Sequence, residues 1–265
     1  MSAEPRAAAR IAGYQMRDVA RSRWVLAYAL FFLLLTYALF RFGGGGSRAL
    51  LSLVDIILFI VPLVTIVFGT MYLYHAREFT ELILAQPVRR RTVFAGLYVG
   101  LVVPLAGSFV AGTGLPFLFY GTAGDGGTLA VVLGTGVLLT LVFGALALLI
   151  AIRADDRLKG LGVAIGVWLL AAVVYDGLVL LAASVFADYP LERPLLAAML
   201  VNPVDLARVV LLLRFDVAAL LGYTGAAFAH LFGGTRGTLV AAAALLLWVA
   251  APLALAARSF SRKDF

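Results

Sequence analysis

Two aspartates lie inside otherwise apolar stretches of the sequence, where a carboxyl group is best placed for proton or ion chemistry. Asp55 lies near the start of one stretch, and Asp176 lies well inside another, between Tyr175 and Gly177. A carboxyl group in a membrane is energetically costly, so each is a candidate proton carrier or ion ligand. Because no basic partner is evident nearby, Asp176 fits a structural hydrogen bond between helices better than a proton relay.

The motifs of common catalytic sites are absent. The sequence has no G-x-x-x-x-G-K-[ST], so it does not form its own P-loop ATPase, and it has neither H-E-x-x-H nor G-x-S-x-G. With no cysteine and two histidines, thiolate and zinc chemistry are disfavoured. We expect a protein that is not an enzyme and that binds no cofactor or metal itself.

The elements that must position the two aspartates are membrane-spanning helices. Hydrophobic residues make up 63% of the 265 residues and charged residues 13%, about half the charged share of a soluble protein. We expect an all-α membrane protein with a single domain, 1–265, an N-terminal interfacial helix and six spans. The spans are expected near 24–42, 54–74, 93–119, 128–151, 160–186 and 238–257.

The distribution of lysine and arginine predicts the orientation of these spans. If both termini lie in the cytosol, most of the 21 basic residues lie on the inner side, as the positive-inside rule requires. The net charge of +7 is therefore a topology signal and not a sign of nucleic-acid binding. A cleaved signal peptide is disfavoured because 23 residues precede the first apolar run.

An outer segment, residues 187–237, precedes the sixth span. We expect two short amphipathic helices in it, at or dipping into the outer face, with Asn202 or Asp205 as the cap of the second and Pro203 in its first turn. Arg208 follows in that helix and is counted among the outer basic residues. The alternative, a seventh span, would place the basic C-terminal tail outside.

The residues before the first span follow a helical pattern. Arg10, Arg17 and Arg21 share one face, and Gln15 and Val19 lie on the opposite one. This pattern predicts an amphipathic helix on the inner leaflet, with its arginines at anionic headgroups. The alternative is a disordered basic tail.

The first inner loop, residues 77–91, has the pattern of a short docking helix that Pro87 ends. Apolar and amide side chains recur at i, i+3, i+4 and i+7, and two glutamates occupy the first turn, where they suit the helix dipole. An aromatic anchor among charges is typical of a small protein interface, although a helix resting on lipid is the alternative. The candidate coupling residues are Arg77, Glu78, Phe79, Glu81, Leu82, Ile83 and Gln86.

The second inner loop lies between the fourth and fifth spans and is short and mixed in charge. Its candidate residues are Arg153, Asp155, Asp156 and Arg157. The loop is either a second contact for a cytosolic partner or a solvated turn that serves as a topology signal.

These features together resemble the six-span permeases of the ABC-2 type, and within them the Nos-type permeases that accompany nitrous oxide reductase. The more specific parts of the resemblance are the inner-loop stretch Glu81-Leu82-Ile83-Leu84-Ala85-Gln86-Pro87-Val88-Arg89-Arg90 and the outer stretch Asn202-Pro203-Val204-Asp205-Leu206-Ala207-Arg208. Phe79-Thr80 stands where the family often has Gly-Thr, a departure within the coupling segment.

The resemblance implies a multi-pass protein of a bacterial or archaeal inner membrane. Its implied partners are a second copy of the chain, ATP-binding subunits that hold ATP and magnesium, the lipid bilayer and a periplasmic accessory protein. The implied role is maturation of the periplasmic copper enzyme through supply of copper or sulfur. The alternatives are a non-transporting scaffold that relays ATPase motion, and an ion-coupled carrier that uses Asp176.

Overall fold

The computed structural model describes residues 13–42, 46–121, 126–186, 192–214 and 235–263. Within these ranges all regular structure is helical, and six helical segments are long and apolar enough to cross a membrane. They agree with the six expected spans, which confirms the all-α membrane fold. The segments are α2 (Arg23–Phe42), α3 (Gly46–His75), α5 (Arg90–Tyr120), α6 (Gly126–Arg153), the continuous run α7 (Arg157–Leu169), η2 (Leu170–Val174) and α8 (Tyr175–Val185), and α12 (Thr235–Arg262).

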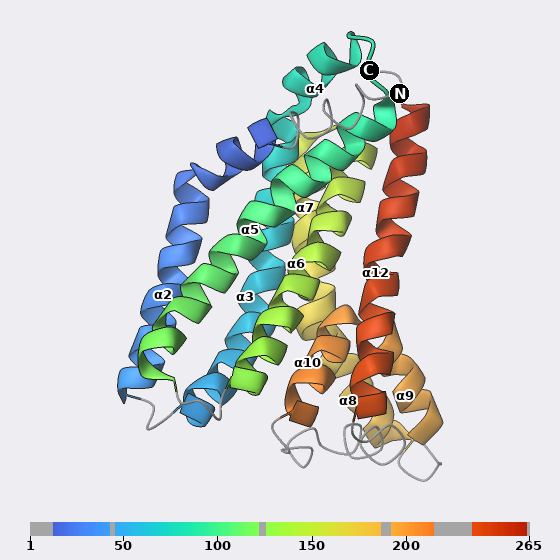
Figure 1. Cartoon of the computed structure of the whole chain (residues 1–265). Helices are drawn as coiled ribbons and strands as arrows, with labels where there is room; N and C mark the ends of the chain where they lie inside the picture. The colour runs from blue at the N-terminus through green and yellow to red at the C-terminus, as the bar shows by residue number, and fades with distance from the viewer. Residues whose placement is uncertain (1–12, 43–45, 122–125, 187–191, 215–234, 264–265) are drawn as a thin grey trace.

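The short helices lie at opposite ends of the bundle. Figure 1 shows α4 (Arg77–Leu84) and the C-terminal end of α12 at one end, and α9 (Glu192–Val201) and α10 (Pro203–Arg214) at the other. The structure therefore separates the first inner loop from the outer segment by the full length of the spans.

The core forms around α6, which packs against α3, α5 and α12. Its buried face includes Leu139 and Phe143, and Gly136 lies directly under the ring of Phe109. The Phe109 ring in turn meets Phe32 of α2 edge to face, with 5.1 Å between the centroids. Large side chains on one helix therefore interlock with small residues on the next, as is common between membrane helices.

Substituting Gly112 in α5 should destabilise this packing. A Cβ atom there would lie 2.6 Å from the carbonyl oxygen of Ala29 and 2.9 Å from the Cβ of Phe32, so α2 would have to move. We expect Gly112→Ala to cost about 1–3 kcal/mol, measured by thermal unfolding in detergent. Gly107→Ala is the matched control because a Cβ at that position meets nothing within 4 Å; equal effects of the two variants would contradict this prediction.

The amphipathic N-terminal helix is present in the part that the structure describes, residues 13–20. Gln15 and Val19 are buried and Arg17 is exposed, as the pattern predicts, while Arg10 lies outside the described residues. The buried face contacts protein, because Tyr72 of α3 donates a hydrogen bond to Gln15 at 3.0 Å and Gly100 of α5 packs against its side chain. The expectation that this face rests on the inner leaflet is corrected accordingly.

The outer segment contains the two expected short helices, α9 and α10, while residues 187–191 and 215–234 lie outside the described residues. α10 packs against α12, α6 and α3. Its side chains are buried around most of the helix, including Leu206, Ala207, Val209 and Leu211. α10 is thus inserted among the spans and does not lie along the outer face.

Candidate functional site

The first inner loop begins with the predicted short helix, α4. Arg77 and Glu81 pair at 3.3 Å across one turn, and the hydroxyl of Thr80 donates to the carbonyl oxygen of Ala76 at 2.8 Å. Glu78 occupies the first turn, where a negative charge suits the helix dipole. These local contacts stabilise a helix of only eight residues that would be marginal alone.

The expected docking face of α4 is divided between the protein and the solvent. Ile83 packs against the core, and the ring of Phe79 stacks on Tyr14 of the N-terminal helix with centroids 5.2 Å apart. Phe79 is half-buried by this contact, which corrects its interpretation as a free aromatic anchor. The side chains that face solvent are Glu78, Glu81, Leu82, Ala85 and Gln86, with Leu82 69% exposed.

The exposed face of α4 therefore combines an apolar side chain, Leu82, with two acidic ones, Glu78 and Glu81. An isolated leucine exposed on a protein surface is ordinary. Here it lies on a helix that projects beyond the spans, beside Glu78 and Glu81. The face has the composition of a small docking surface for a partner with basic and apolar groups.

The second inner loop forms specific contacts with the rest of the chain. Asp156 is the N-cap of α7 and accepts a hydrogen bond from the backbone of Lys159 at 2.8 Å. Arg153 donates to the hydroxyl of Ser259 at 3.4 Å, while Arg157 is exposed. The loop is thus not a simple solvated turn.

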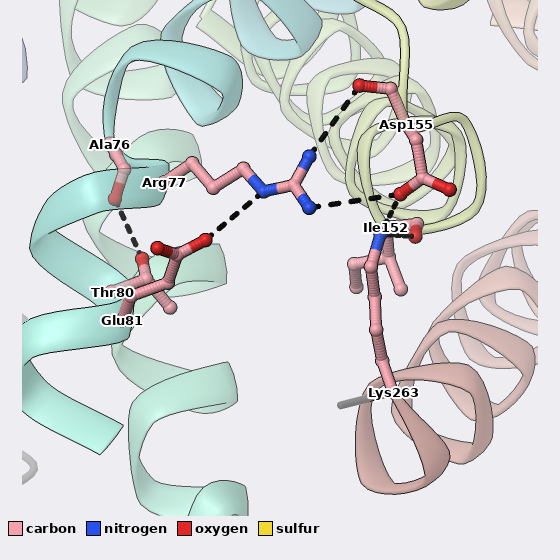
Figure 2. A network of polar contacts seen from close by, with 7 residues as sticks. All are labelled: Ala76, Arg77, Thr80, Glu81, Ile152, Asp155 and Lys263. Atoms are coloured by element: carbon pink, nitrogen blue, oxygen red, sulfur yellow. Dashed lines mark hydrogen bonds and ion pairs between the residues drawn. The ribbon is translucent and has the colours of Figure 1, made fainter. Parts of the chain in front are cut away.

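Asp155 of this loop receives two cations from distant parts of the chain. Figure 2 shows Lys263, beyond the end of α12, with its ammonium 2.7 Å from Asp155 Oδ1, and Arg77 of α4 with its guanidinium 3.7 Å from the same oxygen. The hydrogen bond and charge of Lys263, with a further contribution from Arg77, lower the pKa of Asp155. The side chain is therefore ionised at neutral pH.

The interpretation of the sequence did not include Lys263 or Arg90 in any site. Lys263 was counted only as an inner basic residue, and Arg90 appeared only within the inner-loop stretch that carries the family resemblance. Their partners lie 108 or more positions away in the sequence, so no local pattern indicated these contacts.

A second charged cluster lies at the other end of the bundle. Arg208 of α10 pairs with Asp176 of α8 at 2.8 Å and with Asp205 of its own helix at 3.0 Å. Asp176 therefore has a basic partner, which corrects the expectation that it has none, and Arg208 is half-buried rather than a free outer cation. The separation of 32 residues hid this pair, because only the folding of α10 against span five brings it together.

Hydrogen bonds add to this link between α10 and span five. Asn202 is the expected cap of α10, accepting from the backbone of Val204 at 3.0 Å, and Pro203 begins the helix. The side-chain amide of Asn202 also donates to the carbonyl oxygen of Ala171 at 2.8 Å, and Ala171 lies within the π-helical turn η2. A π turn leaves backbone groups available to such partners and is frequent at functional sites.

Two further residues complete the description of this end. The hydroxyl of Tyr175 donates to the carbonyl oxygen of Ala198 in α9 at 2.6 Å, so α9 is also attached to span five. Asp55 lies on α3 with its side chain exposed. The structure thus brings Asp176, Asn202, Asp205 and Arg208 together and does not place Asp55 in their hydrogen-bonded cluster.

Six spans, a helix that projects from one end of the bundle and a folded segment at the other define a polytopic membrane protein. Residues 46–265 match the family described as ABC-2 family transporter protein. The chain belongs to this family, and it is a multi-pass inner-membrane component of an ABC transporter, a transport subunit and not an enzyme. Family membership also implies an ATP-binding subunit as its partner.

Curated relatives cover almost the whole chain. The chain is 30% identical over 272 residues to a protein named "Probable ABC transporter permease protein NosY" from Pseudomonas aeruginosa, covering 96% of this chain and 97% of the relative. It is 28% identical over 275 residues to a protein of the same name from Stutzerimonas stutzeri, with the same coverage. The expected resemblance to Nos-type permeases is confirmed.

Proposed function

We propose that this permease supports maturation of periplasmic nitrous oxide reductase by supplying copper or sulfur. The proposal is supported by the similarity to two NosY permeases over nearly the full chain. The energy would come from hydrolysis of ATP, which the partner subunit binds together with magnesium, and this chain would hold no cofactor. We further propose that each chain forms a single membrane domain and that two copies of the chain assemble with two ATP-binding subunits.

The observation that carries the coupling part of the proposal is the exposed face of α4. ATP hydrolysis moves the ATP-binding subunits, and a permease needs a projecting element through which this motion reaches its spans. α4 meets this need because it extends beyond the bundle and presents Leu82 beside Glu78 and Glu81. The exposed Leu158 and Arg157 of the second inner loop supply a further contact surface.

A second candidate function is a scaffold that transports nothing and passes ATPase-driven motion to a periplasmic partner. The attachment of α9 and α10 to span five favours it, since a movement of that span would displace the outer segment directly. The ion-coupled alternative is weakened by the Arg208 partner of Asp176, because this carboxylate already has a counter-ion within the protein.

Deletion of the gene tests the maturation role. In a denitrifying cell, loss of the permease should leave nitrous oxide reductase in the periplasm with a depleted copper–sulfur content, measured by metal analysis of the purified enzyme. Restoration by the wild-type gene, but not by a gene for a permease that no longer binds its ATPase, is the expected pattern. A normal copper and sulfur content in the deletion strain would exclude the maturation role and leave the permease assignment intact.

We also propose that both termini are cytosolic, and single cysteines in this cysteine-free chain test the orientation. Phe42→Cys, at the exposed end of α2, should react with an impermeant maleimide in intact spheroplasts. Ser261→Cys, near the end of α12, should react only after permeabilisation. The reverse pattern would show that the positive-inside assignment is wrong.

A further inference from the structure

The C-terminal end of α12 is held by the start of α5. Arg90 donates hydrogen bonds to the carbonyl oxygens of Phe260 at 3.3 Å, Ser261 at 3.3 Å and Lys263 at 2.6 Å. The last carbonyl groups of a helix have no donors within it, and a cation suits the negative end of the helix dipole. Arg90 lies just after the connection from α4, so this contact attaches the sixth span to the first inner loop.

The same end of α12 is also held by the second inner loop. Lys263 donates to Asp155 Oδ1 and to the carbonyl oxygen of Ile152, both at 2.7 Å. The Lys263 side chain is 18% exposed whereas that of Asp155 is 76% exposed, so the lysine reaches inward beneath the loop. Arg153 adds its contact with Ser259. Two separate anchors therefore hold the last turn of the sixth span.

Asp155 extends this attachment to α4. The guanidinium of Arg77, the first residue of α4, donates to the Asp155 carbonyl oxygen at 3.4 Å and pairs with its carboxylate (Figure 2). A cavity of about 40 Å³ is lined by Arg77, Phe260 and Lys263 among others. Side-chain packing is therefore incomplete where α4 approaches α12, and polar contacts through Asp155 join them.

We propose that residues 259–263 and Asp155 form an inner clip, which makes the sixth span follow the displacement of α4. This inference rests on the proposed docking of the ATP-binding subunit to α4. Spans two and three are covalently next to α4 and must follow it. The sixth span is separated from α4 by the 150 residues 85–234 of the sequence. It packs against α6, α10 and α5, and the polar contacts through Asp155 add a direct link between α12 and α4 to that packing.

The clip is assembled from several weak contacts. An exposed ion pair contributes little to stability, so the loss of one contact should not unfold the protein. Its effect is on which elements move together. A clip of this kind is tested by coupled motion and not by unfolding alone.

The test uses the complex of the permease with its ATP-binding subunit in nanodiscs. Spin labels at His75→Cys, two residues before α4, and at Arg258→Cys, on α12 just before the clip, report the distance between the two elements. Both positions are exposed and lie outside the docking face and the clip, and labelled chains are diluted by unlabelled ones. The distance should stay the same between the nucleotide-free and the vanadate-trapped states. In Lys263→Met and in Asp155→Asn it should shift or broaden on trapping, while the ATP-binding subunit still co-purifies.

A second label follows the motion into the membrane. A spin label at Leu239→Cys, exposed near the other end of α12, should change in mobility on vanadate trapping. The fraction of labels whose mobility changes should fall roughly fivefold in Lys263→Met. Lys159→Met is the matched control because it removes an exposed inner lysine outside the clip. Lys263→Arg, which keeps the cation, should retain most of the response.

The outcomes separate the clip from the proposed function. If the ATP-binding subunit co-purifies and Lys263→Met and Asp155→Asn respond to trapping as the wild type does, the clip inference is wrong. If the wild-type permease does not bind the subunit, the coupling proposal and the clip both fail. A lower unfolding temperature without any change in the trapped-state distances would show a purely structural role and would also overturn the clip.

Discussion

Replacing Leu82 with glutamate should abolish stable co-purification of the ATP-binding subunit with the permease. Leu82 is the most exposed apolar side chain of α4 and lies beside two acidic residues, Glu78 and Glu81. A third carboxylate would replace the apolar contact by an uncompensated desolvated charge. Loss of a central apolar contact costs about 2 kcal/mol, or roughly thirtyfold in affinity, and the added charge should increase this loss.

The measurement is the amount of ATP-binding subunit retained on the immobilised permease, together with permease-dependent ATP turnover. Leu82→Met is the matched control, because it keeps an apolar side chain of similar volume and should bind normally. Phe79→Ala should have a smaller effect than Leu82→Glu, since part of the Phe79 ring already contacts Tyr14. Normal binding of Leu82→Glu would show that α4 is not the docking element.

Replacing Arg208 with methionine should strongly destabilise the outer end of the bundle. The change leaves the carboxyl groups of Asp176 and Asp205 without their shared cation. Breaking a buried pair in this way typically costs 3–5 kcal/mol, and we expect about 3 kcal/mol because the Arg208 and Asp176 side chains are 29% and 32% exposed. The expected readout is a lower unfolding temperature in detergent and a lower yield of folded protein.

The complementary variant should be much milder. Asp176→Asn leaves Arg208 paired with Asp205, and the amide oxygen can still accept from the guanidinium, so we expect a cost below about 1 kcal/mol. Adding Asp176→Asn and Asp205→Asn to Arg208→Met should recover part of the lost stability, because no carboxylate is then left unpaired. Equal destabilisation by Arg208→Met and Asp176→Asn would contradict this account. Loss of function in a stable, assembled Asp176→Asn variant would support the ion-coupled alternative.

Local patterns in the sequence predicted elements that depend mainly on neighbouring residues. The six spans, α4 and the cap of α10 at Asn202 all follow from composition, periodicity and capping, which act over a few turns. The sequence correctly predicted which described residues of the N-terminal helix are buried and which are exposed. It wrongly predicted that lipid covers the buried face, which contacts α3 and α5 instead. Periodicity shows which residues share a face and not what covers that face.

The sequence by itself determined that this is an all-α membrane protein with six spans and a short polar helix between the second and third. It did so because a bilayer demands long apolar helices whose backbone groups are satisfied internally. Only the tertiary structure decided that Phe79 stacks on Tyr14, that Asp176 pairs with Arg208 and that Lys263 joins Asp155. These contacts join residues between 32 and 108 positions apart, and helix packing that no local pattern encodes brings them together.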